Sequence, residues 1–115
     1  MKHYADKNAG KRLREARWLN QMSQQELAEK IGVKFQQVQK YETGANRLSA
    51  SRLVMCCEAL GVTPSYFFLG LGLYGEDEMP SINREHAAII AALDRLGDDD
   101  KAAIKKMITT LGLNR

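Results

Sequence analysis

Apolar residues recur at helical spacing along most of the chain, and the clearest case lies within residues 23–44. Three of them share one face of a helix over 24–31: Leu27, Ala28 and Ile31. Ser23 precedes this helix and Glu26 follows three residues later, which is the pattern of a capping box. Gly32 comes next, where a left-handed backbone ends a helix at little cost. The pattern therefore predicts a short helix that is capped at both ends.

A second short helix is predicted over 35–43, followed by Gly44. Val38 and Tyr41 take its inward positions. Its outward positions carry amides and a cation: Gln36, Gln37, Gln39 and Lys40. Amides and cations at the surface of a short helix suit the base edges and phosphates of nucleic acid. The one acid within this helix is Glu42.

The same periodicity predicts three further helices around this pair. The first runs over about 6–20, with Leu13, Ala16 and Arg17 facing inward. Its outward face is expected to be basic: Lys7, Lys11, Arg12 and Arg14. Another runs from a cap at Ser49 or Ser51 to Leu60, and a short one covers 64–69. No strand pattern is convincing, so the predicted fold class is all-α.

After these helices the pattern changes. Residues 70–81, GLGLYGEDEMPS, are rich in glycine and acids and predict a linker. We therefore divide the chain into a first domain over 1–70, a linker over 71–82 and a helical tail over 83–115. The tail predicts two amphipathic helices, over 83–96 and 98–111. Their apolar positions are candidates for dimerisation: Ile90, Leu93, Leu96, Ile104, Ile108 and Leu111. The tail could instead pack back on the first domain or bind another protein.

Charge is unevenly distributed along the 115 residues, whose formal net charge is +3. Residues 1–74 hold 11 Lys and Arg against 6 Asp and Glu, whereas residues 75–115 hold 6 against 8. A basic first part and an acidic tail fit a nucleic-acid-binding domain joined to an assembling segment. The sequence has neither a run of 18 apolar residues nor an apolar signal core near its start. We therefore expect a cytoplasmic protein that does not enter the membrane.

Several kinds of site find no support in the sequence. Cys56 and Cys57 are adjacent, and His3 and His86 lie far from them, so no zinc-ligand spacing is present. We interpret both cysteines as small buried apolar residues. The acid run over 98–100 is typical of a helix start rather than of a metal site. No nucleophile–base pair and no phosphate-binding glycine loop is evident, so we expect no enzyme activity, no cofactor and no metal.

Four segments together resemble the phage-repressor and Cro type of helix-turn-helix protein, often called the XRE family. They are Arg17, SQQELAEKIGV at 23–33, VQKYETG at 38–44 and LVMCCEALGV at 53–62. The resemblance covers about residues 7–70. It implies a compact five-helix, lambda-repressor-like domain that binds double-stranded DNA, with the helix over 35–43 in the major groove.

The resemblance also implies roles for individual residues. Base contacts are expected from Phe35, Gln36, Gln39 and Lys40. Phe35 departs from the usual small or polar residue, and could press on thymine methyl groups or fold back onto the protein. Phosphate contacts are expected from Arg17, Gln24, Gln37, Thr43, Asn46 and Arg47. Arg17 and Glu42 match a structural ion pair, which would neutralise the acid near DNA.

The resulting expectation is a transcriptional regulator, by default a repressor, that binds a palindromic operator as a homodimer. The alternative is an antitoxin or partner-controlled regulator whose tail over 83–115 binds another protein.

Overall fold

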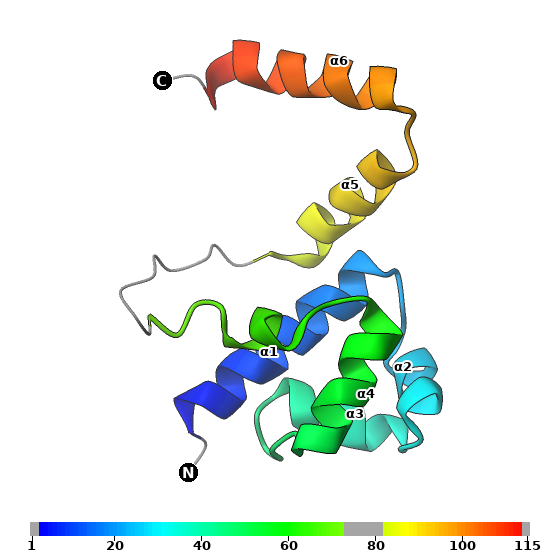
Figure 1. Ribbon diagram of the computed structural model, residues 1–115, viewed down its shortest axis with the longest axis vertical. Helices are drawn as coiled ribbons and strands as arrows, with labels where there is room; N and C mark the ends of the chain where they lie inside the picture. Colours follow the sequence, from blue (N-terminus) through cyan, green and yellow to red (C-terminus); the bar gives the residue numbers. More distant parts are fainter. Residues whose placement is uncertain (1–2, 73–81, 114–115) are drawn as a thin grey trace.

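The computed structural model describes residues 3–72 and 82–113, and every regular element in these ranges is helical (Figure 1). The predicted all-α fold class is confirmed. The elements are α1 (Tyr4–Leu19), α2 (Gln24–Ile31), α3 (Phe35–Glu42), α4 (Ala50–Leu60), the 3₁₀ helix η1 (Pro64–Phe68), α5 (Arg84–Asp94), α6 (Asp98–Ile108) and the π-helical turn η3 (Thr109–Leu113). Most of the predicted linker, residues 73–81, lies outside the described residues.

The helix ends follow the local signals in the sequence. The Ser23 side chain accepts from the backbone N–H of Glu26, and the Glu26 side chain accepts from that of Ser23, which completes the capping box. Of the two candidate caps of α4, Ser49 is the one that accepts from the helix. α1 begins two residues earlier than predicted because His3 Nδ1 accepts from the N–H of Ala5.

The core lies where α1, α2, α3, α4 and η1 meet. It consists of Leu13, Ala16, Leu27, Ala28, Ile31, Val38, Tyr41, Cys56, Cys57, Leu60 and Phe67. Burial of these side chains is the main stabilising term of the domain. Both cysteines are buried and free, as the sequence predicted.

The expectation that Arg12 belongs to an outward basic face is wrong. Its side chain is buried, with Nη1 2.9 Å from Oε2 of Glu15 and Nε donating to the carbonyl of Leu69. Glu15 Oε1 in turn accepts from the backbone N–H of Ile82. Arg12 adjoins the apolar stripe of α1, and the chain after η1 crosses over that side of the helix and buries it. The pair therefore fastens the residues on both sides of 73–81 to α1.

α1 and α3 approach each other closely at Gly10. A Cβ atom at this position would lie 2.3 Å from the carbonyl oxygen of Tyr41, within the backbone of α3. Glycine thus lets the end of α3 pass directly over α1.

The two tail helices behave differently. α5 packs on α1 and buries Ala87 and Ala91 there, whereas α6 extends away from the rest of the molecule and has no buried residue (Figure 1). Of the three alternatives left open for the tail, packing back on the first domain thus applies to α5. None of the described helices is both long and apolar enough to cross a membrane.

Candidate nucleic-acid interface

A three-residue turn joins α2 to α3 and holds the two helices in a fixed relationship. Gly32 adopts a left-handed backbone, with φ of 71°. The carbonyl of Ala28 accepts from the N–H groups of both Gly32 and Val33, so the end of α2 is satisfied within the turn. Lys34 is the N-cap of α3. The sequence therefore builds a helix, a tight turn and a second helix over 24–42.

α3 buries one side and presents the other to solvent. Val38 and Tyr41 are buried in the core. The expected base-contacting residues are all exposed: Phe35, Gln36, Gln39 and Lys40. The ring of Phe35 does not enter the core, since the residue is 39% exposed. The outward surface of α3 thus carries two amides, one cation and one aromatic ring.

Glu42 is the acid within α3, and its carboxylate does not face solvent. The side chain is fully buried, and Arg17 Nε lies 2.7 Å from its Oε2. Oε1 accepts from Arg17 Nη2 at 3.1 Å and from Gln24 Nε2 at 3.0 Å. Arg14 lies 3.4 Å from the same oxygen. Two cations therefore neutralise the acid at the end of α3, and an amide adds a hydrogen bond to it.

These bonds change the role expected of Arg17. Its Nη1 donates to the carbonyl of Met22, so all three of its nitrogens donate within the protein. Arg17 is only 8% exposed. Its position supports the structural ion pair with Glu42 and does not support a contact with phosphate. Gln24, which was also expected at a phosphate, is half-buried and donates to Glu42.

The remaining expected phosphate contacts flank α3. Thr43, Asn46 and Arg47 are exposed, and Gln37 is half-buried on the side of α3. Arg47 Nε lies 3.1 Å from Oδ2 of Asp6, but the arginine side chain is 80% exposed. An ion pair in such a position contributes little to stability and is readily exchanged for another anion.

Two cations near the motif were not among the DNA contacts expected from the sequence. Lys34 is exposed at the start of α3 and makes no side-chain capping bond. A lysine is unusual at this N-cap position, where Ser, Thr, Asp or Asn is preferred. This departure is the signal by which the sequence could have identified Lys34 as a candidate DNA contact. Arg14 lies over the ring of Trp18, 5.9 Å from its centroid, and its side chain is 41% exposed.

The remaining groups with reactive chemistry are the acidic side chains and the two cysteine thiols. Within the described ranges, no group of three or more His, Cys, Asp or Glu side chains is placed to hold a metal ion. Burial raises the pKa of the Cys56 thiol to about 12, and it also raises the pKa of Cys57. Both thiols therefore stay protonated near neutral pH and are poor nucleophiles.

Two adjoining helices, a tight glycine turn and a solvent-facing helix of amides and cations define the class of helix-turn-helix DNA-binding proteins. The helix-turn-helix family model matches residues 11–67. An HTH-type transcriptional regulator of Sinorhizobium fredii is 40% identical over 119 residues, which cover 90% of this chain and 83% of the relative. The chain belongs to this family of DNA-binding transcriptional regulators, as the resemblance in the sequence predicted.

Other relatives match over a shorter part of the chain. A transcriptional regulator in the ATPase CF(0) region of Rhodospirillum rubrum is 49% identical over 69 residues, covering 60% of this chain and 64% of the relative. An HTH-type transcriptional regulator of Rickettsia conorii is 47% identical over 66 residues, covering 57% of this chain and 53% of the relative. No solved structure matches the chain significantly.

Proposed function

We propose that the protein is a repressor that binds a palindromic operator as a homodimer, with α3 in the major groove. One observation carries the proposal. The exposed side of α3 offers amides and a cation, while its one acid, Glu42, is buried against Arg17 and Gln24. The helix can therefore approach the negatively charged backbone of DNA without repulsion from its own carboxylate.

The exposed residues of α3 suit both kinds of DNA contact. A glutamine such as Gln36 can pair with adenine through two hydrogen bonds, and Lys40 can donate to guanine or to a phosphate. The exposed ring of Phe35 can press on a thymine methyl group. Gln39 lies beside these residues, and the flanking polar side chains reach the backbone: Gln37, Thr43, Asn46 and Arg47.

A single domain of this size reads only a few base pairs, so useful specificity needs two copies. Two domains related by a twofold axis would read half-sites about 10 base pairs apart. The apolar side chains that α5 and α6 leave exposed provide the surface for dimerisation. Repression would follow from occlusion of the DNA by the bound dimer.

Selection of bound sequences from a random DNA pool tests the proposal. We expect an inverted repeat, with half-sites about one helical turn apart. The double variant Gln36→Ala/Lys40→Ala is the negative control, since both side chains are exposed and their loss leaves the core intact. Recovery of a single half-site without symmetry would contradict the homodimer, and recovery of no motif would contradict sequence-specific binding. In the second case, a partner protein held by the tail becomes the better explanation.

A further inference from the structure

A pocket lies where the end of α1, the start of α2 and the tail helix α5 come together. Its volume is about 340 Å³. Trp18 of α1 forms part of its wall, and Ser23 and Glu26 line it from the start of α2. Arg84 of α5 completes the lining. The tail therefore brings a cation to the start of the helix-turn-helix motif, far away in sequence.

The packing of α5 holds Arg84 in this place. Just before α5, the backbone N–H of Ile82 donates to Oε1 of Glu15 on α1. At the other end, Arg95 donates to Oε1 of Gln21, a residue that also lines the pocket. α5 is thus bonded to the first domain at both of its ends, and Arg84 lies between these two bonds.

Arg84 is available to bind an anion. The residue is exposed, and it forms no ion pair with any acid of residues 3–72 or 82–113. Arg17 also lines the pocket, but its three side-chain nitrogens already donate within the protein. Of the two arginines in the lining, Arg84 is therefore the one that can meet an external partner.

The charges around the pocket add up to a positive balance. Arg14 adjoins the pocket, since its guanidinium lies over the Trp18 ring that forms part of the wall. Together with Arg17 and Arg84 it makes three cations, against the two carboxylates of Glu26 and Glu42. The surroundings therefore favour a negatively charged occupant.

The other charged residues of α5 near Arg84 do not reverse this balance. Arg84 shares one side of α5 with Ala87 and Ala91, which are buried against α1. Glu85 leaves the helix about 100° further round, on the side turned away from α1. Arg95 adds a fourth cation, because it is bonded to Gln21 at the pocket.

The pocket adjoins the end of the helix that is expected to read DNA. Gln24 follows Ser23 and donates to Glu42, the last residue of α3. Arg14 lies 3.4 Å from the same carboxylate oxygen of Glu42. With α3 in the major groove, the DNA strand that borders the groove at this end passes close to the pocket.

We propose that Arg84 binds a phosphate of the DNA backbone at this pocket, with Arg14 beside it, so that the tail helix α5 takes part in DNA binding. The inference rests on the DNA-binding regulator of the proposed function and adds a contact outside the helix-turn-helix motif. A guanidinium can donate two parallel hydrogen bonds to one phosphate. Such a contact carries no sequence information, but it fixes the position of the protein on the duplex.

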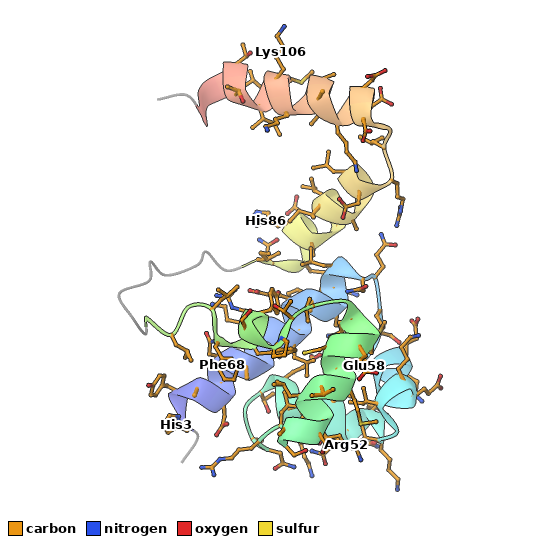
Figure 2. All side chains as sticks on the ribbon, in the orientation of Figure 1. His3, Arg52, Glu58, Phe68, His86 and Lys106 are labelled. Carbon is orange, nitrogen blue, oxygen red and sulfur yellow. The ribbon has the colours of Figure 1, made fainter. Side chains whose placement is uncertain are left out.

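Removal of the cation tests the contact. We expect Arg84→Ala to weaken binding of the full chain to a mixed-sequence duplex by roughly tenfold at about 0.1 M salt, and to reduce the slope of log K against log salt by about one. Lys106→Ala is the matched control. It removes the same charge from α6, away from the first domain (Figure 2), and should alter neither quantity. Equal effects of the two variants in anisotropy titrations would overturn the proposal.

Two further substitutions separate a phosphate contact from a structural role. Lysine keeps the positive charge, so Arg84→Lys should retain most of the salt slope, whereas Arg84→Gln should lose as much as Arg84→Ala. Because Arg84 is exposed, the thermal unfolding midpoint should be the same for all of these variants and the parent. Equal weakening by lysine and glutamine, together with a lowered midpoint, would assign Arg84 to the packing of α5 instead.

A free phosphate ion is the other source of the same chemistry. We expect inorganic phosphate, added at constant ionic strength, to leave the unfolding midpoint of the DNA-free protein unchanged. A rise in the midpoint that Arg84→Ala abolishes, with DNA binding unaffected by the substitution, would assign the pocket to a free anion and overturn the proposal.

The outcome is separable from the fate of the proposed function. The double variant Gln36→Ala/Lys40→Ala is measured on the same duplex. If it loses affinity while Arg84→Ala binds as the parent does, the regulator stands and this inference fails. If Arg84→Ala alone loses affinity, the tail contact stands and the role proposed for α3 fails. Absence of any binding by the parent protein would remove both.

Discussion

Gln24 Nε2 donates a 3.0 Å hydrogen bond to Oε1 of Glu42, so the first residue of α2 is joined directly to the last residue of α3. The two helices of the motif are therefore connected at their outer ends by this bond and at their inner ends by the turn at Gly32. Arg17 adds α1 to the same carboxylate. The orientation of α3 is thus set by buried polar contacts as well as by apolar packing.

Replacement of Glu42 tests the contribution of this cluster to stability. We expect Glu42→Gln to lower the free energy of unfolding by about 3–5 kcal/mol, since the buried guanidinium of Arg17 loses its counter-ion. Chemical denaturation measures the change. Glu29→Gln, on the exposed side of α2, is the matched control and should cost well under ~1 kcal/mol. A similarly small loss for Glu42→Gln and Glu29→Gln would contradict a structural role for the Arg17–Glu42 ion pair.

Addition of one methyl group at Gly10 should be strongly destabilising. Alanine favours helix over glycine by about 1 kcal/mol, so propensity alone predicts a gain for Gly10→Ala. The new Cβ would instead lie 2.3 Å from the carbonyl oxygen of Tyr41, and α1 and α3 would have to move apart. We expect a net loss of about 1–3 kcal/mol in thermal or chemical unfolding. Gly97→Ala, where no atom beyond the chain neighbours lies within 4 Å of the added Cβ, should cost less than about 1 kcal/mol, through the weaker N-cap of α6 alone.

Two exposed residues of α3 should affect DNA binding in distinguishable ways. For Gln36→Ala we expect a loss of about 1–3 kcal/mol on the selected operator and relaxed preference at one base position. If Lys40 contacts a phosphate, Lys40→Ala should weaken binding to all sequences and reduce the slope of log K against log salt by about one. Anisotropy titrations at several salt concentrations separate the two patterns. Lys106→Ala, a cation on α6, serves as the control and should alter neither quantity.

Stability should fall at high pH because of the buried thiol of Cys56. Burial raises its pKa from 9.0 to about 12 in the folded protein, so between these values the unfolded chain releases a proton that the folded chain retains. The unfolded state then binds fewer protons, and the free energy of unfolding decreases as pH rises from 9 towards 12. Denaturation across this range measures the slope. Cys56→Ala should reduce it, and an unchanged slope would assign the effect to other groups such as Tyr66, whose pKa burial also raises.

The sequence predicted the motif well because its signals are local. The capping box at Ser23 and Glu26 and the glycine at 32 act within a few residues, and α2 begins and ends where they place it. The inward positions of α3 also followed from periodicity, since Val38 and Tyr41 are buried.

Other features depend on contacts between distant segments, and periodicity could not reveal them. Arg12 was assigned to an outward face, yet the carbonyl of Leu69 and the carboxylate of Glu15 meet it in the interior. In the tail, the dimerisation candidates were the larger apolar side chains, whereas α5 contacts α1 through the small Ala87 and Ala91. Small residues permit a close approach of helices, and their importance appears only when the neighbouring helix is known.

The burial of Glu42 has a consequence for how this kind of protein can change its target. The residues that hold α3 in place are inside the protein, and the residues that α3 offers outward are exposed and take no part in the core. Gln36, Gln39 and Lys40 can therefore be exchanged with little penalty to folding. If these side chains read DNA bases as proposed, substitutions at them change the preferred DNA sequence without rebuilding the domain that carries them.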